Sequence, residues 1–247
     1  MTPKPETRTP ILASRNVVRL STDEKSANEV HEASKVLLFI NGTPPKNFPD
    51  LENYALIACT DGAFRYLKSQ KFPMKKLDFV SGDFDSQSEK LLLKAKQNAD
   101  FEIIQTPNQD KTDFEKSLEI ILNKGFREVD VFGGSGKEMD HFLGNISAAF
   151  KFKNDLNIKF YDDFSEYFFI PKHFKTQNAK GKTISLYPFP DAKNITTKGL
   201  KWALNKENLS LASRIGTRNI AVENEISIQY ETGDLLIFIG SIQQLKN

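Results

Sequence analysis

Cysteine is almost absent from this 247-residue chain, which contains only Cys59. A single thiol can form neither an internal disulfide nor a zinc site built from cysteine pairs, so the sequence excludes both. The three histidines, His31, His141 and His173, lack the spacing of metal-ligating histidines. Because cysteine-poor chains without disulfides are typical of reducing compartments, we expect a cytoplasmic location.

A strong net charge and long hydrophobic runs are also missing. The 34 basic and 32 acidic residues leave a formal net charge of +2, so the charge balance does not indicate a nucleic-acid partner. No apolar run approaches the roughly 20 residues of a transmembrane helix, and the N-terminus lacks a secretory signal pattern. We therefore expect no nucleic-acid partner and no membrane partner.

The first 34 residues differ from the rest of the chain. Residues 1–34 are polar, include three prolines in the first ten positions and lack sustained hydrophobic periodicity. We interpret them as a polar N-terminal extension, in which Val17–Leu20 is a candidate for one short edge strand. The hydrophobic content of 39% for the whole chain is sufficient for a folded core in the remaining residues.

From Lys35 onward, short apolar runs alternate with helical patterns. Apolar runs without internal alternation indicate strands that are buried on both faces, which is typical of a parallel sheet. We therefore predict an α/β domain over residues 35–171, with a Rossmann-like parallel sheet and helices on both of its faces. The predicted strands are 36–40, 55–59, 78–81, 101–104, 129–132 and 157–161, and the predicted helices are 63–70, 86–95, 112–124 and 140–150.

The pattern changes after residue 171. A polar stretch over 172–182 is followed by short strand patterns and turn residues, without an amphipathic helix. We predict a smaller antiparallel β domain over residues 172–247, in which Thr232–Asp234 turns the last two strands into a hairpin. The strands expected here are 183–187, 201–204, 225–229 and 235–239.

Two carboxylates one residue apart follow the third predicted strand. Asp83 and Asp85 come directly after the glycine that ends this strand, and Ser86 then caps the next helix. Carboxylate oxygens at this spacing suit Mg²⁺, which usually completes its ligands with waters or phosphates. The alternative is an ordinary turn rich in Asp and Ser.

Other acidic residues follow neighbouring strands. Ligands of an open parallel sheet bind beyond the carboxyl ends of its strands, and four consecutive strand ends place acids at that edge. Each acid has a simpler explanation, because Asp61 fits a turn, Asp113 a helix start and Asp140 an N-cap. Their gathering at one edge favours a bound cation, which would relieve the repulsion between them. The polar residues at these strand ends are Asp61, Gly62, Gln109, Asp110, Lys111, Asp113 and Asp140.

A glycine-rich turn follows the fifth predicted strand. Gly133, Gly134 and Gly136 let backbone N–H groups approach an anion, and the next helix directs its positive end to the same place. Lys111 and Lys137 add positive charge for phosphates. Beside the acidic edge, this turn indicates a nucleoside triphosphate with its metal ion.

The only tryptophan, Trp202, has two interpretations. Large aromatic side chains are usually buried, which would place Trp202 in the core of the smaller domain. Alternatively, its ring is a stacking surface for a flat, cationic heteroaromatic ring.

In this order, the motifs resemble those of the thiamine pyrophosphokinases. The resemblance covers about residues 36–240 and implies an N-terminal α/β domain, a C-terminal β-sandwich and a homodimer whose site is shared between subunits. It also implies transfer of a pyrophosphoryl group from Mg·ATP to thiamine, with AMP as the second product. The matching stretches are Asp61–Ala63, Ser81–Ser86, Gln109–Lys116, Gly133–Gly136, Asp140–Asn145 and Lys198–Trp202.

Specific roles follow from this resemblance. The metal ligands would be Asp61, Asp83 and Asp85, and the catalytic carboxylates would be Asp83, Asp85, Asp110 and Asp113, with Asp110 or Asp113 accepting the proton. Nucleotide binding would fall to Asp61, Gly62, Gln109, Lys111, Gly133, Gly136 and Lys137. Thiamine binding would fall to Asp140, Trp202, Arg218 and Asn219.

Two positions depart from the family pattern. Glu138 stands where the family usually has Arg, and Arg218 stands where it usually has Ser. We hypothesise that these two side chains approach each other and that Arg218 supplies the missing guanidinium group. The alternative is that both are solvated and unrelated.

Two other functions are compatible with some of these residues. Asp83–Ser86 superficially resembles the nucleophile motif of aspartyl phosphatases, although the acids after the second and fourth strands would then have no role. A non-catalytic protein that binds thiamine or a nucleotide is the second alternative, because of the changes at Glu138 and Arg218.

Overall fold

The computed structural model describes residues 35–84, 90, 92–95, 97 and 100–242. The predictions for residues 1–34, for Asp85 and for the cap at Ser86 lie outside these residues. The described residues belong to one compact unit. No helix in the described ranges is both long enough and apolar enough to cross a membrane.

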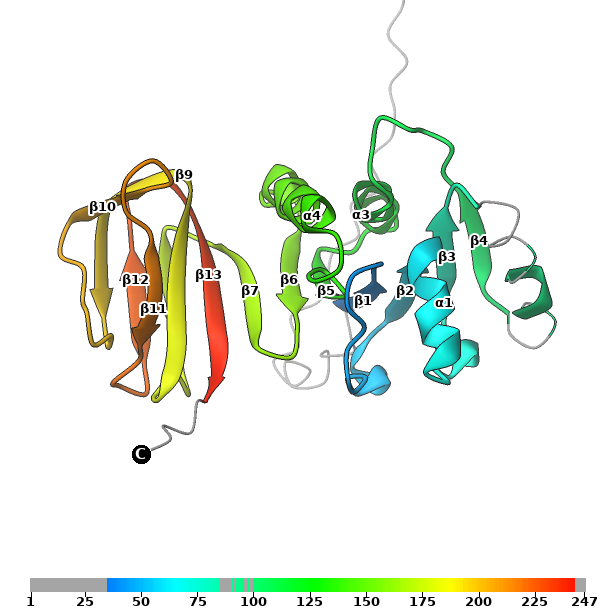
Figure 1. The fold of residues 1–247 in the computed structure, drawn as a ribbon, viewed down its shortest axis with the longest axis horizontal. Helices are drawn as coiled ribbons and strands as arrows, with labels where there is room; N and C mark the ends of the chain where they lie inside the picture. The colour runs from blue at the N-terminus through cyan, green and yellow to red at the C-terminus, as the bar shows by residue number, and fades with distance from the viewer. Residues whose placement is uncertain (1–34, 85–89, 91, 96, 98–99, 243–247) are drawn as a thin grey trace, which may run out of the picture. The chain divides into compact units, whose positions relative to one another are not determined.

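Six parallel strands form the first part of the sheet, in the order β4-β3-β2-β1-β5-β6 (Figure 1). All six were predicted from their apolar runs. Because β1 lies between β2 and β5, their carboxyl ends adjoin at one edge of the sheet. The bounds are β1 Lys35–Phe39, β2 Leu56–Thr60, β3 Phe79–Gly82, β4 Glu102–Gln105, β5 Glu128–Phe132 and β6 Asn157–Tyr161.

Helices pack on both faces of this part of the sheet. On one face, Leu38 and Val131 share a core with residues of α3 (Asp113–Asn123) and α4 (Met139–Phe152). On the other face, Phe39 packs with residues of α1 (Asp61–Ser69). Adjacent strand residues thus face opposite cores, which explains why the strands show continuous apolar runs. Two short 3-10 helices, Leu51–Asn53 and Met74–Lys76, lie in the connections.

The start of α3 matches its predicted position. The side chain of Thr112 accepts a hydrogen bond from the backbone N–H of Glu115 over 3.2 Å, which satisfies one of the free donors of the first turn. The helical spacing of Phe114, Leu118, Ile121 and Leu122 predicts one buried face. The first three are buried, whereas Leu122 is partly exposed.

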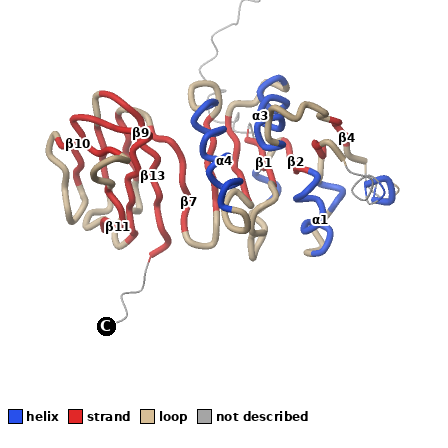
Figure 2. The backbone as a smooth tube through the Cα atoms, turned by 45° about the horizontal axis from the view of Figure 1, so that its top comes forward, coloured by secondary structure: helices blue, strands red, loops and turns tan. Residues whose placement is uncertain are grey.

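After β6 the sheet continues with antiparallel strands. β7 pairs with β6 on one side and with β13 on the other. The long strand β9 pairs with β13 along most of its length and with β12 near its end. No helix follows α4 in the described part of the chain (Figure 2). The bounds are β7 Ser165–Ile170, β8 His173–Thr176, β9 Lys182–Lys198, β10 Glu207–Ser210, β11 Gly216–Ile220, β12 Ile226–Gln229 and β13 Thr232–Ile242.

Two predictions for this part were wrong. Residues 201–204 form a turn, not a strand, because the side chain of Asn219 bonds both the N–H and the C=O of Trp202, at 3.1 and 2.7 Å. In addition, β12 and β13 follow each other in sequence but do not pair. β12 lies between β8 and β9, whereas β13 lies between β7 and β9. The hairpin prediction failed because a strand distant in sequence, β9, pairs with both.

Candidate functional site

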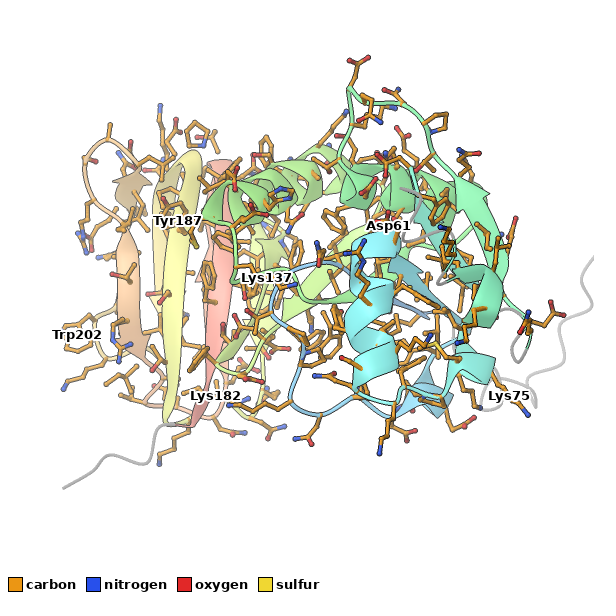
Figure 3. The ribbon with its side chains drawn as sticks, turned by 45° about the vertical axis from the view of Figure 1, so that its right-hand side comes forward. Asp61, Lys75, Lys137, Lys182, Tyr187 and Trp202 are labelled. Atoms are coloured by element: carbon orange, nitrogen blue, oxygen red, sulfur yellow. The ribbon has the colours of Figure 1, made fainter. Side chains whose placement is uncertain are left out.

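A cavity of about 220 Å³ opens at the carboxyl ends of β1, β2, β3 and β5. The starts of α1, α3 and α4 contribute the rest of its wall, so helix N-termini and strand ends meet there. Figure 3 labels two of its residues, Asp61 at the start of α1 and Lys137 before α4. Of the predicted site residues, this cavity gathers Asp61, Gly62, Asp83, Gln109, Lys111, Asp113, Gly136 and Lys137.

Two carboxylates line this cavity directly after neighbouring strands. Asp61 follows β2 and Asp83 follows β3. Asp61 is the first residue of α1, where the helix dipole favours a negative charge. Its side chain lies over Gly82, since a Cβ atom at position 82 would come within 2.7 Å of Asp61 Cγ. The small residue at the end of β3 therefore allows the carboxylate of Asp61 to reach the strand that carries Asp83.

The segment between β4 and α3 closes one side of the cavity. Nε2 of Gln109 donates a long hydrogen bond to Oδ2 of Asp83, at 3.4 Å. Lys111 also borders the cavity, but its ammonium group pairs with Glu119 at 2.5 Å. This hydrogen bond with Glu119 is the main reason that the pKa of Lys111 is raised. Asp110 is exposed and does not line the cavity.

Asp113 also borders the cavity, and one of its oxygens already has a partner within the chain. Its Oδ1 lies 2.8 Å from Nζ of Lys116, which is buried. The geometry therefore leaves Asp113 less available than Asp83 to a metal ion or a proton. This contact was not predicted from the sequence.

The loops after β1 and β5 also border the cavity. The backbone N–H groups of Gly42 and Thr43, after β1, donate to the carbonyl oxygens of Gly133 and Ser135, after β5, at 2.7 and 2.8 Å. A Cβ atom at Gly42 would lie 2.2 Å from Gly133 O, so only glycine permits this approach. Gly133 has a φ of +77°, a left-handed conformation that favours glycine. The predicted glycine-rich turn is thus one half of a two-loop structure.

The other half of this structure and two residues of α4 at the cavity were not predicted from the sequence. Asn41 borders the cavity and accepts a hydrogen bond from Nζ of Lys137 at 3.0 Å. Asn145 donates to Gly134 O at 3.0 Å, and His141 Nε2 lies 3.7 Å from Glu138 Oε2. Asn41–Gly42 follows the first strand as Asp61–Gly62 follows the second. Asn41 could therefore have been predicted as a site residue from its position beyond a strand end.

The predicted thiamine-binding residues do not join this cavity within one chain. Asp140 is exposed at the start of α4, where its Oδ1 accepts the N–H of His141 at 2.9 Å. Trp202 is 55% exposed and lies in the β-rich part of the chain, away from Asp61 and Lys137 (Figure 3). The interpretation of Trp202 as a core residue was therefore wrong. Lys201 Nζ lies 4.9 Å from the centre of the Trp202 ring.

Arg218 and Glu138 border different cavities in the chain. Arg218 lines a cavity of about 480 Å³ on β7, β9, β11 and β13, together with Phe164 and Tyr187. Glu138 lines the cavity at the strand ends, where its Oε2 lies 3.7 Å from Nε2 of His141. A direct pair of Glu138 and Arg218 within one chain is therefore not supported by the described contacts.

The chain was compared with known proteins. Two family models match it, the thiamin pyrophosphokinase catalytic domain over residues 50–160 and the thiamin pyrophosphokinase vitamin B1 binding domain over residues 172–235. The thiamine pyrophosphokinase of Bacillus subtilis is 27% identical over 216 residues, which cover 84% of this chain and 99% of the relative. Thiamine pyrophosphokinase 1 of Oryza sativa is 30% identical over 167 residues, which cover 62% of each chain.

Solved structures give the same result. The crystal structure of the Bacillus subtilis thiamine pyrophosphokinase superimposes with a TM-score of 0.70 at 25% identity, over 84% of this chain and all of that chain. The thiamin pyrophosphokinase from Candida albicans has a TM-score of 0.71 at 17% identity, over 85% of this chain and 89% of that one, which shows a shared fold. The two domain models lie in sequence along the chain and together span most of it, so this chain belongs to the thiamin pyrophosphokinase family.

Proposed function

We propose that this protein transfers the pyrophosphoryl group of ATP to the hydroxyl group of thiamine. The hydroxyl oxygen forms a bond with the β-phosphorus of ATP, and the bond from that phosphorus to the oxygen bridging it to the α-phosphate breaks. The products are thiamine diphosphate and AMP, and the hydroxyl proton is released. The family membership supports the reaction class.

The observation that carries this proposal is the convergence of acids and phosphate-binding elements in one cavity. Asp61 and Asp83 line it together with residues of the loops after β1 and β5. Lys137 adds a positive charge between them, and the starts of three helices favour bound anions there. A polyphosphate with its cation fits such a charge arrangement better than a neutral ligand does.

The donors in this cavity suit Mg²⁺. Asp61 and Asp83 offer carboxylate oxygens, and Mg²⁺ typically binds one or two carboxylates together with phosphate oxygens and waters. We propose Asp61, Asp83 and Asp85 as its protein ligands. When bound, Mg²⁺ would neutralise charge on the phosphates.

The remaining residues of the cavity would position the phosphate chain. Gln109 and Lys137 are polar groups that line the cavity from the loops before α3 and α4. Together with Gly62, Lys111, Gly133 and Gly136, we assign them to nucleotide binding. Catalysis of this kind relies on orientation and charge neutralisation more than on covalent chemistry. Asp110 or Asp113 remains our proposal for the proton acceptor. Since one oxygen of Asp113 is paired with Lys116, Asp110 is the freer base.

Thiamine would bind where two subunits meet. Asp140, Trp202, Arg218 and Asn219 do not line the cavity of their own chain, so we propose that a homodimer brings Trp202, Arg218 and Asn219 of one subunit to the acidic cavity of the other. In this arrangement residues 35–171 form a Rossmann-like nucleotide-binding domain and residues 172–247 form a β-sandwich that binds thiamine. A cytoplasmic location stays a prediction.

An AMP-release assay tests the proposed function. Purified protein is incubated with ATP, Mg²⁺ and either thiamine or one of several other small alcohols, and both AMP and the pyrophosphorylated product are measured. We expect AMP in equal amount to thiamine diphosphate, and neither product without thiamine. Inorganic phosphate with a phosphoenzyme on Asp83 would instead identify a phosphatase, and binding of thiamine or nucleotide by calorimetry without AMP would identify a non-catalytic binding protein.

A further inference from the structure

Lys116 is a buried lysine whose hydrogen-bonding capacity is fully used within the chain. It lies in the second turn of α3 and is only 6% exposed. Its ammonium group lies 2.9 Å from Thr106 O, 3.2 Å from Asn108 O and 2.8 Å from Asp113 Oδ1. A lysine ammonium group has three N–H donors, so these three acceptors match its donors in number.

The three acceptors lie at both ends of the segment that closes the cavity. Thr106 and Asn108 precede Gln109, and Asp113 begins α3. Gln109 in turn reaches Oδ2 of Asp83 at 3.4 Å. A single buried cation therefore holds the two ends of a loop whose middle contacts a proposed metal ligand.

A second contact fixes the start of α3 against the sheet. Ser117 Oγ donates to Asp113 O at 2.7 Å and lies 2.8 Å from Oγ of Ser81 on β3. Ser81 is two residues before Asp83. The hydroxyl pair thus fixes the helix to β3, while Lys116 fixes the loop to the helix.

We propose that Lys116 is a positioning residue that holds Gln109 and Asp113 against the acidic cavity, and that it does not bind phosphate itself. Although Lys116 borders the cavity, a phosphate oxygen could bind its ammonium group only by displacing one of the three acceptors. Loss of the ammonium group would free the segment 106–113 and leave its carbonyl oxygens without a donor. This inference rests on the proposed function for its catalytic consequence, but its structural part can be measured without turnover.

The test compares Lys116→Met, which keeps the length of the side chain but lacks donors, with Lys124→Met in the full chain. Lys124 ends the same helix, pairs with Glu102 at 3.1 Å at the surface and lies outside the cavity. We expect amide hydrogen exchange to accelerate in residues 106–112 of Lys116→Met but to stay unchanged in β1 and β5. We also expect kcat/KM for ATP to fall about a hundredfold, since small misplacements of catalytic groups have effects of this size. Lys124→Met should behave as the wild type in both measurements.

A double-mutant cycle with Gln109→Ala separates positioning from direct phosphate binding. If Lys116 acts through the loop, Gln109→Ala should lower kcat/KM for ATP much less in the Lys116→Met background than in the wild type. If the losses in kcat/KM are additive and amide hydrogen exchange in residues 106–112 is unchanged, the proposal is overturned and Lys116 is instead a phosphate ligand. Exchange that rises equally throughout the chain would also overturn it, because Lys116 would then support only global stability.

Two further outcomes are distinguishable. If Lys116→Met does not fold, Lys116→Gln replaces it, because its amide keeps two N–H donors, and the same readouts apply. If the wild type releases no AMP with thiamine, the proposed function fails. The exchange pattern and the affinity for a non-hydrolysable Mg·ATP analogue still decide whether Lys116 positions the loop.

Discussion

The ammonium group of Lys137 donates a hydrogen bond to Oδ1 of Asn41 over 3.0 Å, although the two residues are 96 positions apart in sequence. This contact joins the loop after β5 to the loop after β1 at the edge of the proposed phosphate site. Lys137 has a φ of +55°, which is unusual for a residue other than glycine. The surrounding structure therefore holds this lysine in an uncommon conformation, a feature often found at functional sites.

Replacing Asn41 by Ala should weaken ATP binding. Without its acceptor, the Lys137 ammonium group is no longer oriented toward the cavity, and hydrogen bonds to charged groups contribute about 1.5–3 kcal/mol. We expect the KM for ATP to rise roughly ten- to 150-fold, whereas the KM for thiamine changes little. Steady-state kinetics with each substrate varied in turn measures both. Asn224→Ala, in the β-rich part of the chain, is the control. An equal rise in the KM for ATP in that variant would contradict the role of Asn41 in ATP binding.

Replacing Asp83 by Asn should abolish turnover while the fold remains. Asp83 is exposed at the end of β3, so its packing contribution is small, and its change to a neutral amide relieves repulsion with Asp61. We expect kcat to fall at least about a hundredfold, because metal-assisted charge neutralisation contributes several kcal/mol, and the Tm without Mg²⁺ to stay equal or rise slightly. Asp155→Asn, an exposed control at the other end of the sheet, should keep full activity. Near-normal turnover of Asp83→Asn at ordinary Mg²⁺ would show that Asp83 is not a metal ligand.

Mixing two inactive variants should restore activity if the site is shared between subunits. Asp83→Asn removes the acidic cavity and Trp202→Ala removes the proposed thiamine surface, and each alone should be inactive. When the two variants are unfolded and refolded together, half of the dimers contain one subunit of each variant. Each of these mixed dimers has one intact site of its two, so about a quarter of the wild-type activity returns. Light scattering should report a dimer under the same conditions. A fully active monomer, or no recovery from a confirmed mixed dimer, would remove the shared site.

Glu138 and Arg218 line different cavities within one chain, so their substitutions should have independent effects on catalysis. Residues without a common partner usually have additive effects on free energy. We therefore expect the losses in kcat/KM for Glu138→Ala and Arg218→Ala to add within about 0.5 kcal/mol in the double variant. A clearly larger coupling would revive the hypothesis that they compensate each other, and would place their contact between subunits.

Tyr230 should make the stability of the protein decrease at high pH. Burial is the main cause that raises the pKa of Tyr230 from 10.0 to about 12, and its hydroxyl donates to Ile170 O at 2.7 Å. The folded state binds the proton of the Tyr230 hydroxyl more tightly than the unfolded state does. The stabilisation of the folded state that results is therefore complete below pH 10 and is lost as the pH rises towards 12. A pKa difference of two units corresponds to a loss of at most about 2–3 kcal/mol in the free energy of unfolding. The unfolding free energy of Tyr230→Phe should therefore fall less than that of the wild type over this interval, and parallel curves would contradict the assignment.

The sequence alone was sufficient to predict strands β1 to β6 and helices α1, α3 and α4, but not strand β7. Continuous apolar runs identified β1 to β6, because strands buried on both faces need apolar side chains at every position. Asp113 indicated the start of α3, because the helix dipole favours an acidic side chain in the first turn. The same local reasoning placed Asp61, Asp83, Gln109 and Lys137 beyond strand ends, and the structure gathers them in one cavity.

Only the tertiary structure decided contacts between segments that are distant in sequence. The pairing of Asn41 with Lys137, the three acceptors around Lys116 and the exposure of Trp202 all depend on which loops the sheet order brings together. The alternating pattern of residues 201–204 is compatible with a strand, but the side chain of Asn219 satisfies the backbone of Trp202 and leaves a turn. Likewise β12 and β13 carry the pattern of a hairpin, yet each pairs with β9. Local patterns specify which backbone conformation a segment favours, whereas its hydrogen-bond partners are set by the whole chain.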